Sequence, residues 1–271
     1  MKKLAILPTL LTLGNAVCGF AALAFASKID ASDPATDVFF VYSAWLILSA
    51  MIFDSLDGYV ARLSRTASDF GGELDSLCDA ISFGVAPAFL LLRLGREWET
   101  PIARQAIAVI AVLYLACAIL RLARFNVENS PDPASHRRFK GLPSPAAAGC
   151  VATLCLLRGG LAGDLSFLDA EQVQAWVKTF APAGTLLVAL LMVSRVPYPK
   201  VTRQLLRGRR RFGHLGRALL LLGLVALTQQ LALFVLFWGY SLSMPLRSLL
   251  LWALRQQPLP ASQPGHDPLP R

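Results

Sequence analysis

The chain has 271 residues, of which 55% are hydrophobic and only 16% are charged, and its mean hydropathy is +0.53. An ordinary soluble domain is about 25% charged, so this composition excludes one large soluble core and predicts an all-α, polytopic integral membrane protein. The net charge of +9 does not indicate nucleic-acid binding, because the basic residues lie between apolar runs and no nucleic-acid-binding motif accompanies them.

Apolar stretches long enough to form membrane helices recur along the chain. They lie near residues 8–27, 38–57, 76–93, 103–121, 142–158 and 179–195. A last apolar region, from about 214 to 254, is interrupted at 228–230 and divides into a short helix and a longer one. The sequence therefore predicts a bundle of about eight transmembrane helices. Pro8 and Asn15 indicate that the start of the first helix is irregular or faces other helices rather than lipid.

The basic residues predict the orientation in the membrane. They concentrate after the second, fourth and sixth predicted helices, as expected for cytoplasmic loops. Both termini are then cytoplasmic. Residues 1–255 form the predicted membrane domain, and 256–271 form a disordered, proline-rich cytoplasmic tail. We expect the basic run 203–211 to rest against anionic membrane lipid, with a simple orientation signal as the alternative explanation.

Acidic residues gather between the second and third predicted helices. Asp54 and Asp57 are three positions apart and Asp75 and Asp79 are four apart, so each pair shares one helix face. If the two helices pack antiparallel across the polar sequence RLSRTASDFGG, four carboxylates meet near the cytoplasmic boundary. Like charges at this density require neutralisation, and an oxygen-only ligand set suits Mg²⁺ or Mn²⁺. The cluster thus predicts phosphoryl chemistry on a diphosphate substrate.

Small residues and one arginine accompany these aspartates. Gly58, Ala61 and Gly71 would let a ligand approach the backbone closely, although small residues also mediate helix packing in membranes. Arg62 is placed to bind a phosphate, or else serves only as an orientation signal.

These residues together form a recognisable pattern. DSLDGYVAR followed by GGELDSLCD fits D-x2-D-G-x2-A-R-x8-G-x3-D-x3-D at every fixed position, and it resembles the signature of the CDP-alcohol phosphatidyltransferases. LPTLLTLGNAVCGFAALAF, ELDSLCDAISFGVAPA, RLARFN, FKGLPSPAAAG and PYPK are similar to the bacterial phosphatidylserine synthase branch of that family. The resemblance covers most of the chain up to about residue 200.

The resemblance implies an activity and a set of roles. The enzyme would transfer the phosphatidyl group of CDP-diacylglycerol to the hydroxyl of L-serine and release CMP. Asp54, Asp57 and Asp75 would bind metal, with two divalent ions expected, and Asp79 would act as general base and contact the second ion. Gly58, Ala61 and Gly71 would leave room for the cytidine nucleotide, and Arg62 would lie near the phosphates. Family analogy also suggests a homodimer in the bacterial inner membrane, with the active site facing the cytoplasm.

A serine hydroxyl needs a base to accept its proton, and the carboxylate cluster supplies one. We therefore expect direct displacement by serine, assisted by metal and without a covalent enzyme intermediate. Candidates for binding serine lie on the next cytoplasmic connection, where positive-inside charge is the alternative explanation: Arg121, Arg124, Asn126, Lys140 and Ser144. The sequence GLPSP at 141–145 is expected to break the start of the fifth helix and to free backbone groups.

Two other functions remain open at this point. A sister enzyme of the same family would use glycerol 3-phosphate or inositol phosphate as acceptor. A cation-coupled transporter or channel would instead place carboxylates near the membrane midplane or on several helices.

Overall fold

The protein was analysed as a computed structural model, which describes residues 2–30, 32–64, 68–96, 98, 100–128, 141–164, 170–196, 198 and 229–255. Within these ranges the chain is helical and contains no strand. The elements are α1 (Lys2–Ser27), the 3₁₀ turn η1 (Pro34–Asp37), α2 (Val38–Ser64), α3 (Asp69–Asp79), the π-helical turn η2 (Ala80–Val85), α4 (Ala86–Gly95), α5 (Pro101–Glu128), α6 (Ser144–Asp164), α7 (Ala170–Val193) and α10 (Gln229–Arg255). The all-α prediction is confirmed.

Among the described residues, five helical segments are long and apolar enough to cross a membrane: Ile6–Ser27, Pro34–Ser64, Phe70–Gly95, Pro101–Val127 and Glu171–Val193. A shorter apolar helix spans Ser144–Gly159. Large apolar side chains point outward from these helices, such as Phe20, Val112 and Leu120, which suits lipid rather than water. The protein is therefore an integral membrane protein. The predicted helix within 214–228 lies outside the described residues, so the count of eight stays a prediction.

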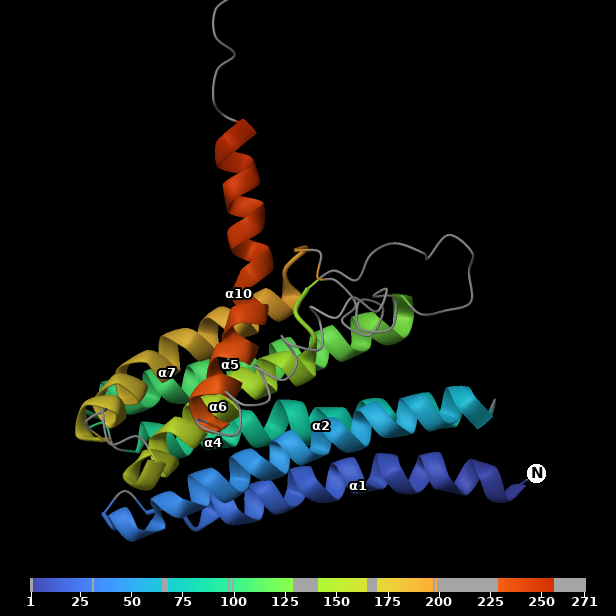
Figure 1. The fold of residues 1–271 in the computed structure, drawn as a ribbon, viewed down its shortest axis with the longest axis horizontal. Coiled ribbons are helices and arrows are strands. Elements are labelled where there is room, and N and C mark those ends of the chain that lie inside the picture. Colours follow the sequence, from blue (N-terminus) through green and yellow to red (C-terminus); the bar gives the residue numbers. More distant parts are fainter. Residues whose placement is uncertain are drawn as a thin grey trace, which may run out of the picture.

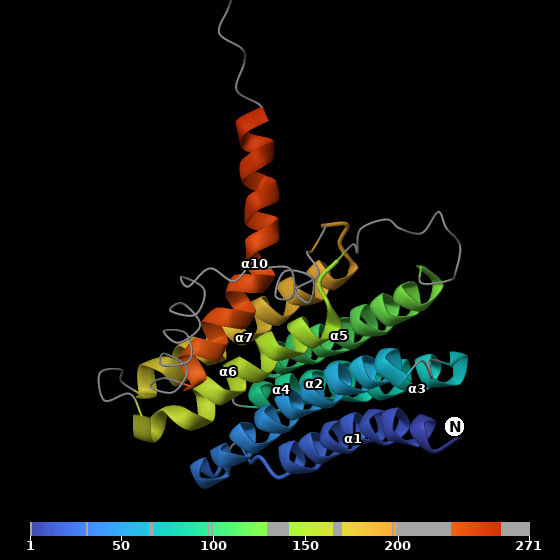
Figure 2. The same ribbon diagram turned by 45° about the vertical axis from the view of Figure 1, so that its right-hand side comes forward.

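The helical spans from α1 to α7 alternate in direction through the bundle, and α3, η2 and α4 continue one another as the third span (Figure 1). α1 and α2 lie side by side along most of their length. The second half of α2, the start of α3, the end of α5 and the start of α6 consequently lie at the same end of the bundle as the N-terminus (Figure 2). α10 crosses the other helices and packs against α6, and its second half extends away from the bundle (Figures 1 and 2).

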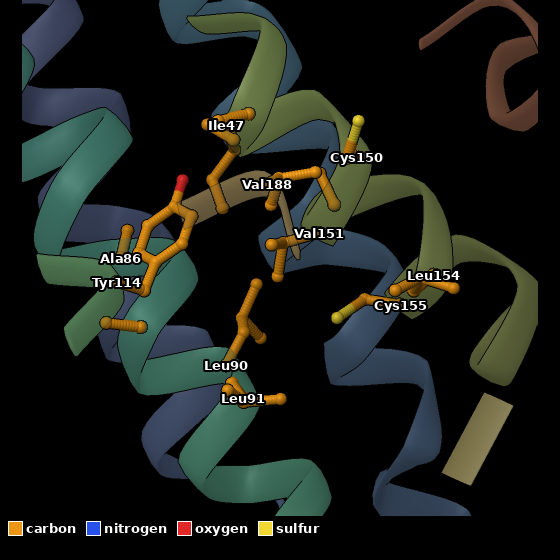
Figure 3. Close-up of a cluster of buried hydrophobic side chains, with 14 of the residues drawn as sticks. Ile47, Ala86, Leu90, Leu91, Tyr114, Cys150, Val151, Leu154, Cys155 and Val188 are labelled. Carbon is orange, nitrogen blue, oxygen red and sulfur yellow. The ribbon is translucent and has the colours of Figure 1, made fainter. Parts of the chain in front are cut away.

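The core is centred on α6, whose residues from Ala147 to Leu157 are all buried. Val151, Leu154 and Cys155 of this helix lie among side chains from α2, α4, α5 and α7 (Figure 3). α10 approaches α6 at Gly149, where an added Cβ would lie 2.2 Å from the Phe237 ring. A buried central helix of this kind holds the surrounding helices, and hence the polar end of the bundle, in fixed positions.

A π-helical turn interrupts the third membrane span directly after Asp79. Pro87 has no N–H to donate to the Phe83 carbonyl oxygen four residues earlier. The buried Tyr114 hydroxyl of α5 donates to that oxygen at 3.0 Å instead. The hydrogen bond from α5 thus satisfies the Phe83 carbonyl oxygen, which Pro87 cannot satisfy within the helix. Single π turns of this kind occur often at functional sites.

α2 continues to Ser64, two turns beyond the predicted boundary at residue 57. The predicted boundary is wrong because loss of apolar character marks where the helix leaves the membrane, not where the helix ends. α3 begins correspondingly early, at Asp69, with Ser68 as its N-cap; the Ser68 hydroxyl accepts from the Gly71 amide at 3.1 Å. Most of the predicted hairpin is therefore helical, and the aspartates lie inside their helices. The predicted tail, 256–271, and the basic run 203–211 lie outside the described residues.

Candidate active site

Three carboxylates meet where α2 and α3 pack at the polar end of the bundle. Asp54, Asp57 and Asp75 each present an oxygen atom, and these three atoms lie within 4.8 Å of one another. Asp57 Oδ2 and Asp75 Oδ1 are buried, and neither has a hydrogen-bond partner among the described residues. A buried carboxylate oxygen without a partner is costly. These residues are therefore arranged to receive a positively charged ligand.

The donor set of this cluster fits a hard divalent cation. It consists of carboxylate oxygens, it comes from two rigid helices, and the like charges require neutralisation. Mg²⁺ sites commonly combine a few carboxylates with water or substrate phosphates, which leaves room for a phosphate-bearing ligand. The spacing of three within α2 brings Asp54 and Asp57 together, and tertiary packing adds Asp75.

Asp79 lies one helical turn beyond Asp75 and is 7% exposed. The side-chain amide of Asn15, on α1, donates from Nδ2 to Asp79 Oδ1 at 2.9 Å. Asp79 also interacts electrostatically with Asp54, Asp75 and Arg121. The structure therefore brings the fourth predicted aspartate beside the other three and gives it a fixed hydrogen-bond donor. Asn15 is a site residue that the sequence analysis assigned only to a helix interface.

The small residues of the pattern line an open face of the cluster. An added Cβ at Gly58 would meet only the guanidinium of Arg62, at 3.6 Å from Nη1. At Gly71 it would meet only Ser68 Oγ, at 3.2 Å. Within the part of the chain that the structure describes, no neighbouring helix packs on either glycine, so the helix-packing explanation is not supported at Gly58 or Gly71. Ala61 is half-buried on the same helix. This face is free for a ligand, with the Arg62 guanidinium beside it.

Arg121, on α5, donates from Nη1 to Ser144 Oγ at 2.7 Å. Ser144 is the first residue of α6 and is fully buried. The Arg121 guanidinium also interacts electrostatically with Asp79 and Asp54. Two of the predicted serine-binding residues thus contact each other, and Arg121 lies close enough to Asp79 and Asp54 to interact with both.

The other predicted serine-binding residues differ in their positions. Asn126 Oδ1 accepts from the Ser76 hydroxyl at 3.1 Å, which links the end of α5 to α3 next to Asp75. Arg124 lies on α5 between Arg121 and Asn126 and is half-buried. Lys140 lies outside the described residues.

The segment before α6 is more tightly fixed than its sequence suggests. Gly141 has φ of 96°, and an added Cβ would lie 2.3 Å from the Met192 carbonyl oxygen, so glycine is required there. The Gly141 amide donates to the Val196 carbonyl at 2.9 Å, and the Leu142 amide donates to the Leu191 carbonyl at 2.9 Å. GLPSP does precede the helix start, as predicted, but the expectation that it frees these backbone groups is wrong. The end of α7 uses them to hold Ser144 in place.

Comparison with known proteins agrees with this geometry. The family model described as CDP-alcohol phosphatidyltransferase matches residues 5–187, which include all four aspartates. The chain belongs to this family. The matched region runs from α1 through most of α7, so it contains both helices of the carboxylate cluster and the Arg121–Ser144 pair.

Named relatives resemble the chain over much of its length. It is 36% identical to the CDP-diacylglycerol–serine O-phosphatidyltransferase of Helicobacter pylori over 201 residues, covering 73% of this chain and 74% of that protein. It is 39% identical over 155 residues to the enzyme of the same name from Methanocaldococcus jannaschii, covering 57% and 62%. It is also 35% identical over 197 residues to the archaetidylserine synthase of Methanothermobacter thermautotrophicus, covering 72% and 70%.

Proposed function

We propose that this membrane enzyme transfers the phosphatidyl group of CDP-diacylglycerol to the hydroxyl of L-serine and releases CMP. The observation that carries this proposal is the Arg121–Ser144 pair beside Asp79, next to three carboxylates whose oxygens lie within 4.8 Å of one another. One part of the site suits a cation with a diphosphate, and the adjacent part suits a small zwitterion. Relatives named for phosphatidyl or archaetidyl transfer to serine support this acceptor.

Asp54, Asp57 and Asp75 would hold the divalent cation, Mg²⁺ or Mn²⁺, and Asp79 would contact a second ion. When bound, such ions offset charge on the diphosphate and stabilise CMP as the leaving group. The open face at Gly58 and Gly71 would accept the cytidine nucleotide, with Ala61 bordering it. The Arg62 guanidinium, which already lies over Gly58, would bind a phosphate oxygen.

Asp79 would serve as general base. Its carboxylate accepts the proton of the serine hydroxyl as that oxygen attacks phosphorus, the new O–P bond forms, and the bond to the CMP oxygen breaks. Arg121 would bind the serine carboxylate, with Ser144 holding the guanidinium in place and Asn126 and Arg124 bordering the pocket. Lys140 stays a predicted member of this pocket.

The site would face the cytoplasm of a bacterial inner membrane. The N-terminus, the end of α2 and the end of α5 share one end of the bundle (Figure 2). The basic residues Arg62, Arg121 and Arg124 belong to these segments, which matches the positive-inside distribution. Contact of the basic run with anionic lipid and a homodimeric state also stay predictions.

An acceptor screen with purified protein tests the function. CMP release from CDP-diacylglycerol would be measured with Mn²⁺ or Mg²⁺ and, in turn, L-serine, glycerol 3-phosphate, inositol phosphate or no acceptor. We expect release that depends on serine. Release with only a phosphorylated acceptor would instead identify the sister activity, and absence of release with every acceptor would favour cation transport.

A further inference from the structure

Asn15 carries a buried amide in the middle of an apolar membrane helix. Its side chain is fully buried, and its Nδ2 donates to Asp79 Oδ1 at 2.9 Å. Polar side chains inside membrane helices are costly and tend to mark functional positions. A leucine of similar volume would fill this position without that cost.

The hydrogen bonds of Asn15 argue against a purely structural role. Asn15 Oδ1 is buried and has no hydrogen-bond partner among the described residues. The gain from the bond to Asp79 is therefore offset by an unsatisfied acceptor on the same amide. A residue retained for stability would be expected to use both ends of the amide. The feature that distinguishes Asn15 is thus the donor that it presents to Asp79.

A second hydrogen bond joins the backbone of α1 at Asn15 to the turn η2, which follows Asp79. The Ser82 hydroxyl donates to the Asn15 carbonyl oxygen at 2.9 Å, and Ser82 lies in η2, which begins directly after Asp79. α1 and η2 meet so closely that a Cβ added at Gly19 would lie 2.8 Å from the Ser82 Cα. α1 therefore contacts the segment around Asp79 at two points. One is the Asp79 side chain, and the other is the Ser82 hydroxyl, three residues later in the chain.

We propose that Asn15 is a positioning residue for the general base. Its amide N–H fixes the rotation of the Asp79 carboxylate through Oδ1 and leaves Oδ2 to accept the proton of the acceptor hydroxyl. This inference rests on the proposed role of Asp79. It assigns to α1 a part in the reaction that the aspartate pattern on α2 and α3 does not include.

The test compares Asn15→Leu with the wild-type full-length protein. We expect kcat for serine-dependent CMP release to fall roughly 10- to 100-fold, as is typical when a residue that orients a functional group is removed. The KM for CDP-diacylglycerol should stay within about twofold, because Asn15 does not touch the small residues or the arginine proposed to bind the nucleotide and its phosphates. The melting temperature should change little, since Leu also removes the unsatisfied oxygen. Asn15→Gln, which retains the donor, should keep more of kcat than Asn15→Leu.

Ser43→Ala is the matched control. Ser43, on α2, is also fully buried, and its hydroxyl donates to the Ala22 carbonyl of α1 at 2.9 Å. This variant should lower the melting temperature and leave kcat unchanged. Wild-type kcat in Asn15→Leu, or a loss of kcat accompanied by an equal rise in the KM for CDP-diacylglycerol and a loss of stability, would overturn the inference. The proposed role of Asp79 is checked separately, because an active Asp79→Asn variant would refute that role whatever Asn15→Leu does.

Discussion

Arg121 and Ser144 lie on different helices, and the Arg121 guanidinium donates to the Ser144 hydroxyl at 2.7 Å beside Asp79. The bond orients the guanidinium, whose remaining N–H groups are in a planar arrangement that matches a carboxylate. Substitution of Arg121 by Gln should therefore raise the KM for serine at least about tenfold, the loss of roughly one charge-assisted hydrogen bond. Initial rates at varied serine and at varied CDP-diacylglycerol would measure it, and the KM for CDP-diacylglycerol should change much less.

Arg158→Gln provides the control for that substitution. Arg158 forms an ion pair with Asp37 at 3.4 Å, just before the start of α2, and not with the aspartates of the cluster. Like Arg121→Gln, this variant removes one partly buried arginine. It should leave both KM values unchanged. Equal increases in both KM values for Arg121→Gln would show that Arg121 has no specific role in serine binding.

The unpartnered oxygens of Asp57 and Asp75 predict a specific metal phenotype. Asp75→Asn keeps the shape of the side chain but removes one negative charge from the cluster. The Mn²⁺ concentration for half-maximal activity should rise at least about tenfold, because a neutral amide oxygen binds a hard cation less well than a carboxylate does. The measurement is a Mn²⁺ titration of initial rate at saturating substrates. An unchanged midpoint with normal activity would argue against Asp75 as a ligand.

Substitution of Gly58 by alanine should affect nucleotide binding without lowering the stability of the fold. Among the described residues, an added Cβ would meet only the Arg62 guanidinium, at the far end of a flexible side chain, and alanine favours a helix over glycine by about 1 kcal/mol. Gly58→Ala should therefore preserve or raise the melting temperature while it increases the KM for CDP-diacylglycerol several-fold. Gly72→Ala is the control, because no neighbouring atom of the described residues lies within 4 Å of a Cβ added there and Gly72 is not part of the fixed pattern. Equal KM values for the two variants would refute the assignment of Gly58 to the nucleotide face.

Direct displacement by serine predicts the stereochemical outcome at phosphorus. A single in-line attack inverts the configuration, whereas two displacements through a phosphatidyl-enzyme would retain it. CDP-diacylglycerol made chiral at the transferred phosphorus with sulfur or oxygen isotopes would report this, analysed by ³¹P NMR of the product. Inversion is expected. Retention, or isolation of a phosphatidyl-enzyme adduct, would contradict the displacement.

Local spacing was sufficient to predict part of this site. Separations of three and four residues place Asp54 with Asp57, and Asp75 with Asp79, on single helix faces, and the structure has both pairs. The bond between Asn15 and Asp79 depends on how α1 packs against α3 and η2, which no local pattern encodes. An asparagine within an apolar run was the available signal, and it indicated an inward-facing side chain but not its partner.

The same distinction applies to the fold. Apolar runs located the membrane helices because burial in lipid requires them, but they placed the end of α2 two turns too early. The region 58–64 is less apolar than the residues before it, with Arg62 among its residues, and it is still helical. The turn η2 depends on Pro87 together with a hydroxyl from α5, so its position could not be read from the third span alone.

The most direct test of the central claim is to measure whether the protein forms phosphatidylserine and whether this activity requires the four aspartates. Purified wild-type protein and a variant with Asn at positions 54, 57, 75 and 79 would be incubated with CDP-diacylglycerol, isotope-labelled serine and Mn²⁺, and the lipid product would be quantified by mass spectrometry. The account predicts labelled phosphatidylserine and an equal amount of CMP from the wild type, and neither from the folded variant. Full activity in the variant would contradict the account.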